Sequence, residues 1–229
     1  MSTFLQLCQQ YHQEIGAAGT ITTVLDQTGM LKRYIDWIAK ANRKIQGRKA
    51  NWKFLWNTWE LTFVTGISEY SPPDGLGSFD EDSFWVGAGT ADAYKLDFVE
   101  YKYWRDVLRN EFIDSGEPSY LTIKPNGKVA LLPTPDSDSN GLIVTADYWR
   151  APVELSDNNQ VSLIPPMFHD LIISLAKMYH AEYRHDSGVY AAASVEHETM
   201  YRDLKAHSLP GKEEDNRSES VFQKVIVVD

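Results

Sequence analysis

Apolar residues recur with two different spacings along this chain, and the change of spacing limits the folds that are open to it. In residues 28–46, apolar side chains return every three or four positions, which is the spacing of one face of an α-helix. Residues 3–15, the stretch that opens at Pro165-Pro166, and residues 187–205 repeat this pattern. Proline is favoured at a first helical position, so Pro165-Pro166 marks the start of a helix. Helices are therefore predicted on both sides of the middle of the chain.

The middle of the chain changes to the alternating pattern of β-strands. Trp59, Leu61 and Phe63 alternate with polar residues, as expected for a strand with one buried face. Residues 118–133 hold two β-rich runs on either side of Asn126-Gly127. That pair favours the tight turn of a β-hairpin, because both positions tolerate positive φ. The middle is therefore predicted to be a small, mostly antiparallel sheet.

Together these patterns predict an α+β fold. Residues 1–58 and 157–209 are expected to form a helical bundle. Residues 59–156 are expected to form an inserted antiparallel β-sheet domain. Residues 210–229 are expected to form a flexible linker and an extended C-terminal β arm.

Between the periodic segments, residues 74–96 are rich in Gly, Asp and Ser, and this composition predicts a long exposed loop. Residues 96–103 are predicted to form a strand, and residues 104–112 a short helix. The GAGT run at 87–90 resembles a phosphate-binding loop, but no Lys-Ser/Thr pair follows it and no βα unit surrounds it. We therefore assign no phosphate site to this region.

An aromatic cluster, NWKFLWNTWELTF, lies between the predicted helices and strands. Interleaved basic and aromatic residues can stack single-stranded nucleic acid, provided that they line an exposed sheet or groove. Tryptophan is more often largely buried. We therefore favour a core seam between helices and sheet, formed by Trp52, Phe54, Trp56 and Trp59.

The C-terminal residues form a second distinctive segment. Residues 210–220 are polar and rich in charged residues, which is typical of a linker. The β-branched, almost uncharged run that follows either folds back onto the protein's own sheet or adds to a sheet or groove of another chain. We favour the second alternative, because such a strand aggregates unless something covers it. Its predicted contact residues are Val221, Phe222, Val225, Ile226 and Val227.

Charge is distributed unevenly. The chain has 32 Asp and Glu against 22 Lys and Arg, a formal net charge of −10. Residues 61–160 hold 17 acidic and seven basic residues, whereas residues 1–60 hold four acidic and eight basic ones. Affinity for nucleic acid comes largely from Lys and Arg that neutralise phosphates. An acidic middle therefore argues against tight DNA wrapping, although DNA can still slide past such a surface.

The helix predicted at 28–46 has a basic face that includes Lys40, Arg43 and Lys44. Such a face is usually solvated. The alternative is contact with a partner or with DNA, and we name these three residues as a candidate secondary contact face.

No pattern in the sequence predicts catalytic, cofactor-binding or metal-binding residues. The one cysteine, Cys8, excludes an internal disulfide framework and a cysteine-zinc cluster. The six histidines include no His-Glu-x-x-His pair, and no Walker loop, nucleophile elbow or dinucleotide fingerprint occurs. The N-terminal residues do not read as a signal peptide, and no apolar run approaches the roughly 18 residues of a membrane span. We expect a soluble product without cofactors or membrane partners.

Three segments resemble the head-to-tail adaptor proteins of tailed bacteriophages. This family of connector or neck proteins docks beneath the portal, includes tail accessory factors and is similar to the tail tubular A proteins. The opening TFLQLCQQYHQEIG carries the first part of the resemblance. The second is LKRYIDWIAKANRKIQGRKANWKFLW with the following WELTFVTGISEYSPP, and the third is DYWRAPVELSDNNQVSLIPPMFHDLIISLAKMYHAEYRHD.

This resemblance implies a structural virion protein, not an enzyme. It implies a ring of twelve copies that docks on the portal protein, extends the DNA channel and offers a platform to the downstream tail or nozzle protein. Double-stranded DNA would pass without specific binding, and the C-terminal arm would grip the portal. The expected location is the virion neck, after assembly in the host cytoplasm.

Two other functions remain open from the sequence. A tail-tube or tail-terminator protein would share the β-rich middle, but such proteins are mainly sheet, whereas at least four helices are predicted here. An enzyme of an unrecognised type would need a pocket in which titratable groups converge.

Overall fold

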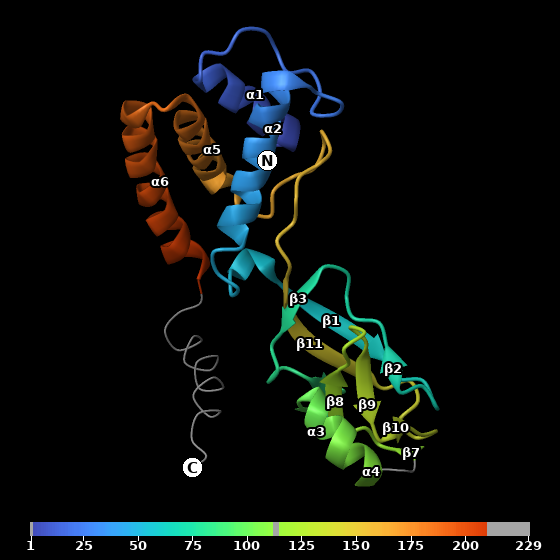
Figure 1. The fold of residues 1–229 in the computed structure, drawn as a ribbon. Helices are drawn as coiled ribbons and strands as arrows, with labels where there is room; N and C mark the ends of the chain where they lie inside the picture. The colour runs from blue at the N-terminus through green and yellow to red at the C-terminus, as the bar shows by residue number, and fades with distance from the viewer. Residues whose placement is uncertain (1, 112–114, 210–229) are drawn as a thin grey trace. The chain divides into compact units, whose positions relative to one another are not determined.

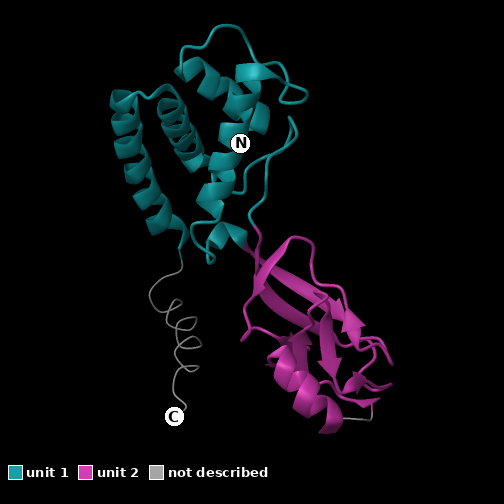
Figure 2. Cartoon of the chain, viewed as in Figure 1, with its two compact units in different colours: residues 1–55, 152–229 teal, residues 56–151 magenta. Residues whose placement is uncertain are grey.

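The computed structural model describes residues 2–111 and 115–209 of the chain (Figure 1). The chain forms two compact units, which Figure 2 distinguishes by colour. One unit holds the described residues up to Leu55 and those from Pro152 onward, and the other spans Trp56–Ala151. Helices and mostly antiparallel sheets make the fold α+β, as the sequence predicts.

The first unit is helical. Its elements are α1 (Phe4–Glu14), α2 (Gly29–Gln46), α5 (His169–Arg184), α6 (Ser187–Ser208) and the short 3-10 helices η1 (Lys53–Leu55) and η3 (Pro166–Phe168). Helix α5 packs against α2 and α6, and α1 packs against α2 and α5 (Figure 1). The apolar spacing of the sequence predicts all four long helices.

Local interactions explain where these helices begin. The Thr3 hydroxyl accepts a hydrogen bond from the Gln6 backbone N–H, while the Gln6 side chain accepts one from the Thr3 N–H. This capping box satisfies two backbone groups that the first turn of α1 leaves unpaired. The Asp186 carboxylate caps α6 by accepting from the Val189 N–H at 3.0 Å.

The second unit is a layered β structure. Its strands are β1 (Trp56–Thr62), β2 (Glu69–Tyr70), β3 (Leu76–Phe79), β4 (Trp85–Val86), β5 (Tyr94–Lys95), β6 (Asp97–Phe98), β7 (Ser115–Gly116), β8 (Tyr120–Ile123), β9 (Val129–Leu132), β10 (Thr134–Pro135) and β11 (Ile143–Arg150). One sheet has the order β1-β11-β4-β5, with β3 also paired to β11. A second has the order β2-β9-β8-β6, and β7 pairs with β10.

The two larger sheets share one apolar core. Val144, Ala146 and Tyr148 of β11 are in the same buried cluster as Leu121 of β8 and Leu131 of β9. Successive residues of a strand point to opposite faces, so the neighbours of Leu131 in β9 enter a different cluster. The second sheet is therefore covered on both faces.

That second cluster joins β9 to a helical segment. Ala130 and Leu132 pack with Trp104 and Leu108, which lie in η2 (Trp104–Leu108), a π-helix between the single turns α3 (Tyr101–Tyr103) and α4 (Arg109–Glu111). The helical segment begins earlier than predicted. The strand expected at 96–103 is only the two residues of β6, because the chain turns helical at Tyr101.

The hairpin predicted around Asn126-Gly127 is present. Strands β8 and β9 pair antiparallel, and Gly127 has a φ of 80°, the left-handed backbone region that glycine adopts at low cost. The prediction of a long exposed loop at 74–96 is wrong. This region contains β3, β4 and β5, and it buries Phe79, Phe84 and Val86 in the core.

The aromatic cluster near residue 55 does not form a single seam. Trp52 is fully buried in the helical unit, where its ring stacks on Phe54 and meets Tyr201 edge-on. Trp59 packs on Phe79 in the sheet unit. Trp56 is 39% exposed on the surface of the same sheet. Alternation along β1 explains why Trp59 is packed and Trp56 exposed. Trp59 points to the same face as the buried Phe63, and Trp56 points to the opposite face.

Candidate interaction surfaces

The basic face of α2 lies beside α5. Apolar residues of α2 face the core of the helical unit, so Lys40, Arg43 and Lys44 point outward. Together with Gly47 and Pro152, the three side chains line one shallow hollow. The structure therefore brings the predicted secondary contact residues together.

These three cations have different neighbours. The Lys40 and Lys44 ammonium groups lie 4.4 and 5.5 Å from the ring centroid of Tyr179 on α5. The Arg43 guanidinium instead forms an exposed ion pair with Glu154 at 3.3 Å. Tyr179 is 8% exposed, and a cation over an aromatic ring gains about 0.5–2 kcal/mol, more where the pair is shielded from water, without an opposite charge beside it. Lys40 and Lys44 have no carboxylate partner within the described ranges.

The same arrangement recurs nearer the start of α2 and just beyond its end at Gln46. Arg33 lies 4.5 Å from the ring centroid of Tyr183, and Arg48 lies 4.5 Å from that of Tyr201. Tyr183 is 48% exposed, although the apolar pattern of α5 predicts it to face inward. The sequence pattern does not identify these tyrosines as partners of the cations, because they come from helices far along the chain.

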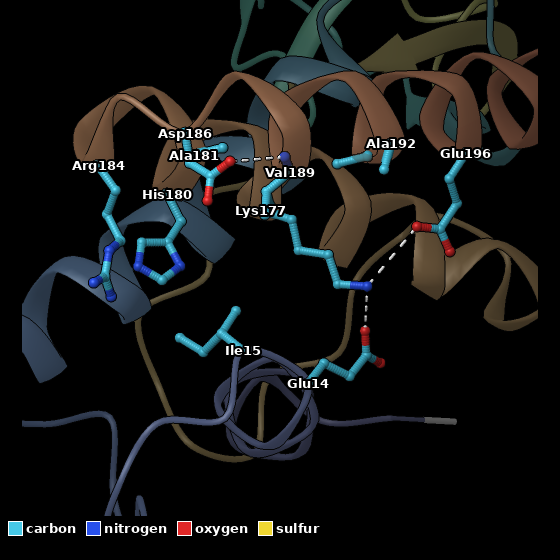
Figure 3. A pocket seen from close by; sticks show the side chains of 11 residues that line it. Glu14, Ile15, Lys177, His180, Ala181, Arg184, Asp186, Val189, Ala192 and Glu196 are labelled. Atoms are coloured by element: carbon cyan, nitrogen blue, oxygen red, sulfur yellow. Dashed lines mark hydrogen bonds and ion pairs between the residues drawn. The ribbon is translucent and has the colours of Figure 1, made fainter.

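A second hollow, of about 500 Å³, lies between α1, α5 and α6 (Figure 3). The Lys177 ammonium group in it is 2.6 Å from a Glu14 carboxylate oxygen and 3.8 Å from one of Glu196. Burial favours the neutral amine, but the hydrogen bond and charge of Glu14 and the charge of Glu196 outweigh it and raise the pKa of Lys177. An amine held in its charged form by two carboxylates is suited to joining three helices, not to acting as a base.

One serine–histidine pair occurs in the helical unit. Ser174 Oγ lies 3.2 Å from His197 Nδ1. Both residues are only 1% exposed, so a substrate cannot reach them, and the hydroxyl donates to the Leu171 carbonyl at 2.9 Å. In residues 2–111 and 115–209, no group of three His, Cys, Asp or Glu side chains could hold a metal ion.

The outer face of the five-stranded sheet is a third surface. Alternation along paired strands places one set of side chains on this face: Trp56, Thr58, Glu60 and Thr62 of β1, Ile143, Thr145, Asp147 and Trp149 of β11, Trp85 of β4, and Lys95 of β5. Trp85 is 44% and Ile143 46% exposed. The Trp56 and Trp149 rings are 5.8 Å apart. We call this set the outer sheet face.

The predicted arm residues, Val221, Phe222, Val225, Ile226 and Val227, lie outside the described residues. Among the helices that are described, none combines the length and hydrophobicity that a membrane crossing requires.

Each of the two units carries a face of charged and aromatic residues, which is the kind of surface through which the proteins of an assembly bind one another. The chain belongs to the SU10 adaptor protein family, whose model matches residues 2–222. It is thus a phage head-to-tail adaptor, a structural protein of the virion neck. No curated protein matches the chain.

Proposed function

We propose that this adaptor docks on the portal ring of a tailed phage, extends the DNA channel and provides the attachment platform for the downstream tail or nozzle protein. It acts as a ring of twelve copies, assembled in the host cytoplasm, through which double-stranded DNA passes without specific binding. The role is structural and requires neither catalysis nor a cofactor.

The family match is the observation that carries this proposal. It runs from residue 2 to residue 222 and so includes both units. The surfaces on each unit support it further, because a ring subunit must contact neighbours on two sides as well as the proteins above and below. The tail-tube alternative is not favoured, since four long helices make up most of one unit.

The C-terminal arm is the proposed portal contact. Val221, Phe222, Val225, Ile226 and Val227 would add to a sheet or groove of the portal, with backbone hydrogen bonds giving affinity and alternate side chains giving specificity. Lys40, Arg43 and Lys44 provide a secondary contact face.

Light scattering of the protein mixed with a candidate portal ring tests this proposal. The full chain is expected to join the portal stoichiometrically, and a chain that ends at Lys212 is expected not to bind. If neither chain binds, portal docking is wrong. If the shortened chain binds as well as the full one, docking stands and the arm is not the contact.

A single substitution tests the arm without shortening the chain. Phe222→Asp places a charge in the proposed strand and should weaken portal binding by at least about tenfold, because a buried unpaired carboxylate costs several kcal/mol. Ser218→Asp adds the same charge to the linker and should leave binding unchanged. Equal binding by both variants would contradict the arm.

A further inference from the structure

The outer sheet face lacks a covering layer in its own unit. The five-stranded sheet packs its inner face into the shared core, and the segment that contains Trp104 covers the other sheet. Trp56, Trp85 and Ile143 therefore remain 39–46% exposed together on one surface. Trp56 lies beside Trp149 at one end of the paired strands, whereas Ile143 lies at the other end, near Trp85 of β4. Exposed tryptophans of this kind are enriched where proteins bind one another.

This face is also acidic. Glu60 is exposed on β1, and Asp147 of β11 accepts a hydrogen bond from the Thr58 hydroxyl at 2.9 Å. Neither carboxylate has a cationic partner in residues 2–111 or 115–209. The Lys95 ammonium on the same face is neutralised by Asp82 at 2.8 Å. The partner of this face should therefore present positive charge beside apolar or aromatic surface.

The basic face of α2 has that chemistry. Residues 29–53 hold eight Lys and Arg and one Asp, whereas residues 56–151 hold seven Lys and Arg and sixteen Asp and Glu. The Tyr179 ring holds the Lys40 and Lys44 ammonium groups without neutralising them. One chain thus carries two complementary surfaces, one on each unit.

We propose that the outer sheet face of one copy binds the basic face of α2, centred on Lys40 and Lys44, in a second copy of this chain. This inference rests on the proposed function, since it names the contact between neighbours in the ring. Two different surfaces that join head to tail generate a ring when the rotation closes. The carboxylates elsewhere on the sheet unit remain available to the DNA channel.

Charge reversal on either surface should prevent self-association of the full chain. In K40E/K44E both contacting surfaces are acidic, and in E60K/D147K both are basic. Each variant alone is expected to associate at least tenfold more weakly than the unmodified protein in sedimentation velocity without portal. Raising the salt concentration from about 50 mM to about 500 mM should also weaken the self-association of the unmodified protein, since the Debye length shortens several-fold.

Mixing the two variants provides the decisive measurement. In a mixed assembly the two variants alternate. The acidic helix face of K40E/K44E then meets the basic sheet face of E60K/D147K, and the acidic sheet face of K40E/K44E meets the basic helix face of E60K/D147K. Every contact therefore joins opposite charges again. The mixture, and the single chain that carries all four substitutions, should recover association. A general loss of folding could not produce this recovery, because neither misfolded variant would rescue the other.

Matched controls and one apolar variant complete the test. R202E on α6 and E111K on α4 reverse exposed charges away from both faces and should not alter association. W85T removes an exposed indole from the sheet face and should weaken association without changing the melting temperature. Circular dichroism of each variant checks the fold.

Three outcomes would overturn this inference: a full chain that stays monomeric up to its solubility limit, a mixture that fails to recover, or charge reversals without effect. Loss of association on Phe222→Asp, with K40E/K44E unaffected, would show instead that the C-terminal segment joins the copies and that the basic face of α2 does not. Portal binding separates this contact from the adaptor function. An unmodified chain that docks on the portal but does not self-associate refutes only the contact, whereas an unmodified chain that does not dock refutes the adaptor function.

Discussion

His197 and His169 are buried at 1% and 3% exposure in the helical unit. Burial lowers the pKa of His197, and nearby Arg48 adds to the effect. Burial also lowers the pKa of His169, although its hydrogen bond to the Ile164 carbonyl opposes the shift. Both imidazoles are therefore neutral in the folded protein at neutral pH, at a position where a charge would be costly.

This burial predicts that acid destabilises the helical unit. An unfolded histidine has a pKa near 6.5, and the folded values lie below it, so the unfolded state binds more protons as the pH falls. The stabilisation is present above about pH 6.5 and is lost as the pH falls through the folded pKa values. Urea unfolding followed by helical circular dichroism should show a falling midpoint below that pH.

Substitutions distinguish the contribution of the buried histidines to the pH dependence of stability from that of the carboxylates, which also titrate in acid. His197→Phe keeps a ring stacked near Tyr201 and should make the dependence on pH shallower. His185→Asn replaces an exposed histidine at a position with a φ of 56°, which asparagine also adopts, and should leave the slope unchanged. Equal slopes in both variants would show that His197 does not contribute.

At the scale of elements, Lys177 joins three helices. Its ammonium group bridges Glu14 of α1 and Glu196 of α6, and the side chains of Lys177 and Glu14 are 23% and 34% exposed. Lys177→Met keeps the aliphatic stem but leaves Glu14 with the Gln10 amide as a hydrogen-bond donor and no cation, so we expect the free energy of unfolding to fall by about 1 kcal/mol. Lys32→Met, which removes the more exposed pair with Asp36, should cost about 0.3 kcal/mol. Equal losses in urea titrations would contradict the special role of Lys177.

The elements that the sequence predicts well are those whose signal is local. Apolar spacing identifies α2, and Asn126-Gly127 identifies the hairpin of β8 and β9. The sequence does not predict β3 and β4, because they are four and two residues long, too short to show alternation, and because each pairs with the distant β11. The hydrogen-bonding partner, not the local composition, makes them strands.

The same distinction applies to the candidate surfaces. The cationic positions of α2 follow from its helical spacing alone, so Lys40, Arg43 and Lys44 could be named from the sequence. Tyr179 could not be identified as their neighbour, because the packing of α2 on α5 decides that contact. Nor could Trp85 be placed on an exposed sheet face, since its flanking Gly and Asp residues indicated a loop.

At the scale of the whole molecule, the two units differ in charge, and this difference bears on DNA passage. The sheet unit holds sixteen acidic and seven basic residues. Its net negative charge repels phosphates, so DNA that passes through the channel should not bind to it. We predict that the assembled protein shows no tight binding to duplex DNA in fluorescence anisotropy at about 150 mM salt. A variant with Asp74, Asp92 and Asp138 changed to lysine should bind measurably, with a steeper salt dependence.

Measuring DNA binding by the unmodified protein distinguishes two alternatives. Either the acidic sheet unit keeps DNA from binding, or the basic face of α2 contacts DNA. Each phosphate contact made by a cation contributes about −0.9 to the slope of log affinity against log salt. Tight binding with a steep slope would refute the first alternative. If K40E/K44E then abolished that binding, the contact would be assigned to Lys40 and Lys44 on α2. If it did not, cations outside this pair would hold the DNA, because a phosphate contact needs a positive partner wherever it forms.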